Sequence, residues 1–194
     1  SRPVVCMDET PKQLIKEIRR SLPGKPGFEE RVDYEYSRCG VCNVFMISEP
    51  LAGRRFTKVT SQRTKKDWAL LVKYICDKLY PDAEIITLVM DNLASHSAAA
   101  LYETFEPEEA KRIWDRLDFI YTPKHGSWLN MAEIELNVLT KQCLNRRIED
   151  LKTIKTEVNA WQCHRNNKDS RIKWQFTTKD ARVKLHRLYP SIHG

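Results

Sequence analysis

The pattern of apolar and polar positions divides the chain into buried strands and amphipathic helices. Residues 2–9 and 84–92 are apolar runs that end in acids, and neither alternates, as expected for strands covered on both faces. A turn at 49–53 between two β-forming stretches predicts a hairpin. The expected strands cover residues 2–9, 34–49, 54–60, 84–92 and 118–121.

Segments with apolar residues three and four positions apart lie between these strands. The segment 67–79 shows this spacing and stops before Pro81, and Pro107 occupies a favoured first position of a helix. The expected helices, apart from the one discussed below, cover residues 67–79, 97–105, 107–117, 150–166 and 178–188.

The order of these elements predicts an α/β fold in three layers, a mixed central sheet flanked by helices on both sides. A connection of helical length before residues 84–92 favours a parallel neighbour for that strand. Residues 10–33 are expected to be an insertion made of a loop and a short helix at 12–20. Residues 145–194 are expected to form a helical C-terminal part of the same domain, which spans 1–194.

The segment that follows the last expected strand combines a loop with the start of a helix. Pro123 and Gly126 break the backbone pattern and predict a loop over 122–126. Ser127 stands ahead of an apolar periodic pattern, where the N-cap of a helix is expected.

Two acids flank the apolar stripe of that helix. The stripe consists of Leu129, Ala132, Leu136, Leu139 and Cys143. Glu133 and Glu135 lie on either side of it, and periodicity alone does not choose between them. A carboxylate turned toward the core at such a position needs a cationic partner or a metal ion.

Two further acids, Asp8 and Asp91, stand at the ends of apolar runs. Together with an acid from this helix they could form a cluster of three carboxylates. If the two strands are parallel neighbours, their carboxylates meet at one end of the sheet, and Glu133 enters from the same end. Three clustered carboxylates repel one another unless a cation lies between them, and oxygen ligands favour Mg²⁺ or Mn²⁺. Each acid taken alone also fits a turn, a cap or an ion pair.

The charge of the chain favours a polyanionic partner. Its 33 Lys and Arg residues exceed its 26 Asp and Glu residues by seven, and no apolar run is long enough to span a bilayer. Arg54, Arg55 and Lys58 on the returning arm of the hairpin are candidate DNA contacts, although solvated surface explains such residues equally well.

The six cysteines favour free thiols in a reducing compartment. Cys39 and Cys42 have the spacing of a zinc knuckle, but no second pair follows to complete four ligands.

Three segments resemble the acidic motifs of DDE transposases. They are Cys6-Met-Asp-Glu-Thr10, Leu88-Val-Met-Asp-Asn-Leu-Ala-Ser-His96 and Tyr121-Thr-Pro-Lys-His-Gly-Ser-Trp-Leu-Asn-Met-Ala-Glu133. The likeness is greatest to the bacterial insertion-sequence branch of the mariner superfamily, and it extends from Val4 to Pro190.

The resemblance chooses among the acids and implies a fold and a reaction. It selects Asp8 over Glu9 and Glu133 over Glu135, and it leaves Glu135 as a surface or supporting acid. It implies an RNase H-like fold in which Asp8, Asp91 and Glu133 hold two Mg²⁺ or Mn²⁺ ions. The implied activity is cleavage of DNA at transposon ends and strand transfer into target DNA.

The resemblance further implies a DNA-associated protein of the bacterial cytoplasm that assembles as a homodimer or a larger complex on DNA. Family members carry helix-turn-helix modules ahead of this domain, and this chain is expected to be a fragment without them. Two alternatives remain: a catalytically silent DNA-binding or assembly module of the same fold, and a purely hydrolytic RNase H-like nuclease.

Further candidates surround the three acids. They are Asn92, His96, Lys124, His125, Trp128 and Asn130. Asn92, His96 and His125 are candidates to orient the metal ligands, although a helix cap explains His96 equally well. Lys124 is the best-placed cation for a scissile phosphate. Trp128 is interpreted as an apolar anchor in preference to a base-stacking residue, and Asn130 as a residue that orients Glu133 or contacts the backbone.

Overall fold

A computed structural model describes residues 2–19, 21–29, 31, 33–93, 96–123 and 126–186. Five strands form one mixed sheet in the order β3-β2-β1-β4-β5. The strands are β1 (Val4–Glu17), β2 (Tyr36–Glu49), β3 (Arg54–Thr60), β4 (Ile86–Met90) and β5 (Leu117–Tyr121). Strands β1, β2 and β3 pair antiparallel, and β1, β4 and β5 pair parallel, so the predicted hairpin and the predicted parallel neighbours are confirmed.

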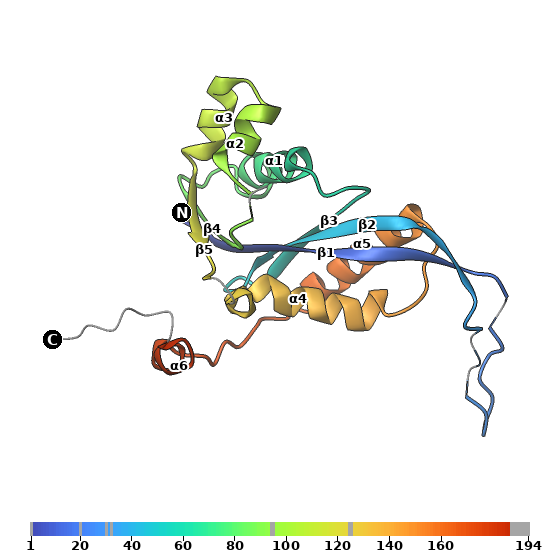
Figure 1. The fold of residues 1–194 in the computed structure, drawn as a ribbon. Coiled ribbons are helices and arrows are strands. Elements are labelled where there is room, and N and C mark those ends of the chain that lie inside the picture. The colour runs from blue at the N-terminus through green and yellow to red at the C-terminus, as the bar shows by residue number, and fades with distance from the viewer. Residues whose placement is uncertain are drawn as a thin grey trace.

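Helices cover both faces of the sheet, which confirms the three-layer α/β architecture (Figure 1). They are α1 (Lys65–Tyr74), α2 (Ala98–Thr104), α3 (Pro107–Trp114), α4 (Met131–Leu139), α5 (Leu151–Asn167) and α6 (Thr178–Lys184). A π-helical turn continues α1 over Ile75–Leu79, and another continues α4 over Thr140–Leu144. Helices α1, α2 and α3 lie on one face, whereas α4 and α5 lie on the other.

The sheet separates two hydrophobic cores, and successive residues of its central strands enter them alternately. Val5 and Met7 of β1 belong to the core under α1, α2 and α3, while Cys6 belongs to the core under α4 and α5. Phe45 and Met46 of β2 divide in the same way. These strands therefore have apolar residues at consecutive positions, because both of their faces are buried.

The expected short helix over 12–20 is wrong, because strand β1 continues to Glu17 and pairs with β2 along its whole second half. Leu14 is buried there, whereas its neighbours along the strand are half-buried or exposed. Lys12 is held by hydrogen bonds from its Nζ to the carbonyl oxygens of Leu144 and Arg146. Long-range pairing thus overrides the local helical preference of this segment.

Cys39 and Cys42 lie together on β2 but differ in burial. Cys39 is exposed, Cys42 is buried, and all six cysteines are free thiols. Within the described ranges, no helix is both long and apolar enough to cross a bilayer.

Candidate active site at the end of strand β4

The three acids come from three adjacent elements. Asp91 directly follows β4, and Glu133 lies in the first turn of α4. Asp8 does not end its strand as expected but lies within β1, two residues beyond Cys6, the last residue of β1 that pairs with β4. Because side chains alternate along a strand, Asp8 points to the same face of the sheet as Cys6, which is the face that α4 covers.

The electrostatics of Asp8 show that these carboxylates lie near one another. Burial, together with the smaller effect of the negative charges of Glu9, Glu133 and Asp91, raises the pKa of Asp8 to about 7, although a hydrogen bond from the backbone N–H of Glu9 opposes the shift. A carboxyl group with such a pKa is near the midpoint of its titration at neutral pH. The site therefore favours either a proton or a cation.

The donor set matches the preference of Mg²⁺ and Mn²⁺ for carboxylate oxygens. Glu9 adds a buried oxygen, Oε2, that lacks a hydrogen-bond partner within the described part of the chain. In the arrangement of the described residues, however, no three His, Cys, Asp or Glu side chains converge closely enough to hold one ion. The chemistry and the charge of the site thus fit a divalent cation, and its binding requires the carboxylates to draw together.

His96 links two acids beside the site. Its Nδ1 lies 3.0 Å from Oδ1 of Asp91, and its Nε2 lies 3.7 Å from Oε1 of Glu9. Its ring is buried and stacks on Trp68, with 5.6 Å between the ring centroids. Oε1 of Glu9 also accepts a hydrogen bond of 3.2 Å from Arg63. The contact of His96 with Asp91 involves two residues that the sequence singled out, whereas the contacts of Glu9 and Arg63 have no local signal in the sequence.

Asn130 joins the start of α4 to strand β1. Its buried side chain donates from Nδ2 to the carbonyl oxygen of Met7 at 2.8 Å and accepts from the N–H of Ala132 at 3.1 Å. Asn130 is thus the N-cap of α4, and the expected cap, Ser127, instead begins a 3₁₀ turn that ends at Leu129. The contact fixes the first turn of α4, which carries Glu133, against the residue that precedes Asp8.

The loop before α4 requires a glycine. A Cβ atom at Gly126 would lie 2.6 Å from Cγ of Pro123, a distance that side chains do not tolerate. The N–H of Gly126 donates to the carbonyl oxygen of Pro123 at 2.8 Å. Pro123 and Gly126 therefore approach each other closely just before the helix that carries Glu133.

Glu135 is not a surface acid: its side chain is fully buried. It accepts hydrogen bonds of 2.7 and 3.0 Å from Arg165 of α5 and one of 3.2 Å from Nη2 of Arg55 of β3. Nε of Arg55 is also 3.1 Å from Oε2 of Glu135, at an angle that does not make a hydrogen bond. This Arg55–Glu135–Arg165 triad joins α4, β3 and α5, so Glu135 supports the fold beside the site.

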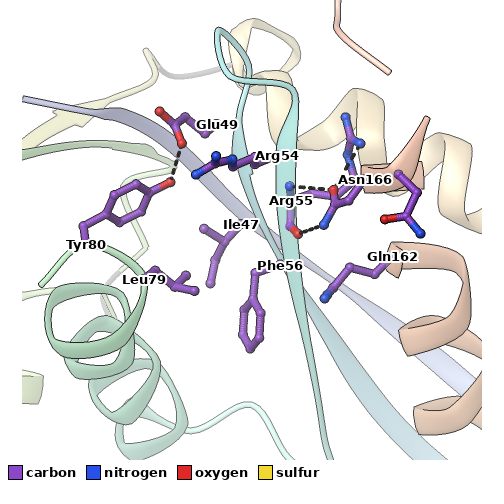
Figure 2. A pocket seen from close by; sticks show the side chains of 10 residues that line it. Ile47, Glu49, Arg54, Arg55, Phe56, Leu79, Tyr80, Gln162 and Asn166 are labelled. Atoms are coloured by element: carbon purple, nitrogen blue, oxygen red, sulfur yellow. Dashed lines mark hydrogen bonds between the residues drawn. The ribbon is translucent and has the colours of Figure 1, made fainter. Parts of the chain in front are cut away.

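The same contacts correct the expectation that Arg55 touches DNA. Arg55 is buried, and its Nη1 donates to the carbonyl oxygen of Arg165 and to Oδ1 of Asn166. Figure 2 shows Arg55 and Asn166 bound to each other beside a pocket of about 400 Å³. Across this pocket, Tyr80 donates a hydrogen bond of 3.0 Å to Glu49. None of the three acids lines this pocket, so it is separate from the candidate active site.

The other candidates have varied surroundings. Asn92, Arg54 and Lys58 have exposed side chains. Lys124 and His125 lie outside the described residues. Trp128 is half-buried and contacts Phe176 edge to face, with 4.9 Å between the ring centroids.

We expect the stability of the metal-free protein to fall as the pH rises from about 4 to about 7. Because the pKa of Asp8 is raised to about 7, the folded state binds a proton more tightly than the unfolded chain in this interval, and that advantage is lost on deprotonation. Asp8→Asn should remove this slope and stabilise the metal-free protein by roughly 1–2 kcal/mol at pH 8. Urea unfolding in EDTA at several pH values measures both effects; identical slopes for the two proteins would contradict the raised pKa.

Comparison with known proteins adds a family and a fold. The model of a family described as DDE superfamily endonuclease matches residues 3–155. The crystal structure of the Mos1 mariner paired end complex with Mn has a TM-score of 0.57 and 13% identity, covering 84% of this chain and 48% of that chain. The Mos1 strand transfer complex has a TM-score of 0.57 and 12% identity, covering 84% and 47%. The chain thus spans about half the length of these relatives, and a comparison with curated proteins finds no match.

Proposed function

Because the chain belongs to the DDE superfamily endonucleases, we propose that it is a transposase catalytic domain of insertion-sequence type that cleaves DNA at transposon ends and joins them to target DNA. The observation that supports this most directly is the raised pKa of Asp8, to which the negative charges of Asp91 and Glu133 contribute after burial. Such repulsion is unfavourable in the isolated chain and becomes favourable when a cation binds.

In this proposal Asp8, Asp91 and Glu133 together hold two Mg²⁺ or Mn²⁺ ions. Such ions would supply a nucleophile of lowered pKa and stabilise the leaving oxygen of the phosphodiester. His96 holds Asp91 through its Nδ1, and Asn130 fixes the helix turn that carries Glu133. The proposed partners are transposon-end and target DNA, with a homodimer or larger assembly on that DNA.

The test of this function is metal-dependent nicking of supercoiled plasmid. We expect nicking with Mg²⁺ or Mn²⁺, none with EDTA, and a fall to the EDTA level for Asp91→Asn. Asp118→Asn is a matched control, because Asp118 is an exposed acid on the neighbouring strand β5. Equal nicking by wild type and Asp91→Asn would contradict the proposed site, and a folded protein that never nicks would favour the silent module.

Strand transfer needs a separate assay, because a nuclease of the same fold would also nick. Here a labelled, pre-cut transposon end and a target plasmid are supplied together. We expect covalently joined products that require the free 3′-hydroxyl of the end. Hydrolysis without joining would favour the hydrolytic nuclease.

A further inference from the structure

The segment after α5, residues 168–186, is called here the C-terminal arm. It contains six Lys and Arg residues and two Asp residues, so it carries four of the seven net positive charges of the chain. It lies beyond residues 3–155, which match the family model. In Figure 1 it leaves the end of α5, runs below the body of the domain and ends in α6.

The cations of the arm differ from those of the helical layer formed by α1, α2 and α3. In that layer Lys65, Lys73, Lys111, Arg112 and Arg116 form ion pairs with Asp or Glu, and only the exposed Lys66 and Lys78 form none within the described residues. On the arm, four exposed cations have no ion pair within the described residues: Lys168, Lys173, Lys179 and Arg182. Unpaired exposed cations concentrated in one segment are a surface prepared for anions.

The beginning of the arm is held against the hairpin turn between β2 and β3. The buried Arg55 donates a hydrogen bond from Nη2 to the carbonyl oxygen of Ser170. Gly53 in the turn has a φ of +66°, and a Cβ atom there would lie 2.8 Å from Cγ of Arg171 and 3.0 Å from Oδ1 of Asp169. The close approach of the arm to this glycine fixes where the arm starts.

The far end of the arm is held against the loop that leads to Glu133. Phe176 contacts both Trp174 and Trp128, with 6.1 and 4.9 Å between ring centroids. Nζ of Lys184 in α6 lies 4.6 Å from the centre of the Trp128 ring, within the range of a cation–π contact. Trp128 is five residues before Glu133, so the basic arm lies next to the candidate active site.

Between these two contacts, exposed and half-buried residues alternate along the arm. Ile172, Trp174 and Phe176 are half-buried, whereas Arg171 and Lys173 are exposed. An extended segment with this alternation turns its apolar side to the protein and its cations to solvent. The exposed side therefore carries Arg171, which is paired with Asp169, and the unpaired Lys173.

We propose that the C-terminal arm binds the phosphate backbone of duplex DNA beside the candidate active site. The inference rests on the proposed function for its partner, but the arm is identified by its own charge, anchors and position. Lysine and arginine contacts to phosphate release counterions, so they supply affinity without base specificity. The arm would hold the DNA flanking the phosphodiester that the acids cleave.

The test compares two double variants of equal charge in binding to a short fluorescent DNA duplex. Lys173→Ala with Arg182→Ala removes two unpaired cations of the arm, and Lys78→Ala with Lys111→Ala removes two exposed cations of the helical layer on the opposite face. We expect the arm variant to bind roughly tenfold or more weakly at about 0.1 M salt. Its plot of log affinity against log salt should lose about two units of slope, since each phosphate contact contributes about 0.9. The layer variant should match the wild type.

Anisotropy titrations over a range of salt concentrations measure these quantities, and circular dichroism verifies that both variants fold. Equal affinities of all three proteins, equal losses in the two variants, or no binding by the wild type would each overturn the role of the arm. The proposed function has a separate test, which is whether Asp91→Asn loses metal-dependent nicking. A protein that nicks normally but shows no contribution of the arm would retain the function and lose this inference.

Discussion

Replacement of Glu133 by glutamine is expected to reduce metal-dependent nicking about 1,000-fold while leaving the protein folded. The amide keeps the size of the side chain and removes the charge that joins those of Asp8 and Asp91. Loss of one carboxylate ligand removes several kcal/mol of transition-state stabilisation, and about 4 kcal/mol corresponds to three orders of magnitude in rate. Half-buried Glu133 makes no side-chain hydrogen bond or ion pair within the described residues, so among them its replacement removes no such contact.

The rate is measured by the conversion of supercoiled to open-circular plasmid at saturating Mn²⁺, and stability by urea unfolding in EDTA. Glu133→Asp serves as the conservative variant, since it keeps the charge and shortens the side chain. We expect it to retain part of the activity that Glu133→Gln loses. Nicking by Glu133→Gln at the wild-type rate would show that this acid is not a ligand and would reopen the choice between Glu133 and Glu135.

The sequence predicts the elements that are set by local pattern and fails where a distant partner decides. The β2–β3 hairpin and the parallel pairing of β1 with β4 follow from apolar runs and the length of the connections. The second half of β1 does not, because its residues favour a helix until β2, which begins at Tyr36, pairs with them. Such pairing partners are far apart in sequence and leave no periodic signal in either segment.

The same limit applies to the candidate site. Periodicity places Glu133 and Glu135 at the edges of one apolar stripe, and both are compatible with facing inward. Arg55 on β3 and Arg165 on α5 neutralise Glu135, whereas Glu133 lies near enough to Asp8 to raise its pKa. The partners of Glu135 lie 30 or more residues away from it in sequence. Local periodicity therefore does not separate the two acids. The family motif singles out Glu133, and the fold shows why Glu135 has a structural role.

Replacement of Glu135 by glutamine is expected to affect stability, whereas Glu133→Gln affects activity. We expect it to lower the free energy of unfolding by about 3–5 kcal/mol. Burial lowers the pKa of Arg55, and the negative charge of Glu135 opposes that shift. The carboxylate of Glu135 therefore stabilises the buried positive charge of the guanidinium. The amide leaves Arg55 without its counter-charge in a place that water does not reach. For a domain of this size the loss corresponds to a melting temperature about 10 °C lower.

Urea unfolding in EDTA measures this loss, and Glu149→Gln is the matched control. Glu149 forms an exposed ion pair with Lys16 at 3.6 Å, so its substitution should change stability by less than about 1 kcal/mol. A similarly small change for Glu135→Gln would show that the triad is hydrated and does not hold α4 in place. Because Glu135 supports the helix that carries Glu133, we further expect the folded fraction of Glu135→Gln to nick DNA when assayed well below its melting temperature. Glu133→Gln should nick about 1,000-fold more slowly than the wild type at every temperature, so the two substitutions separate a ligand from the structure that positions it.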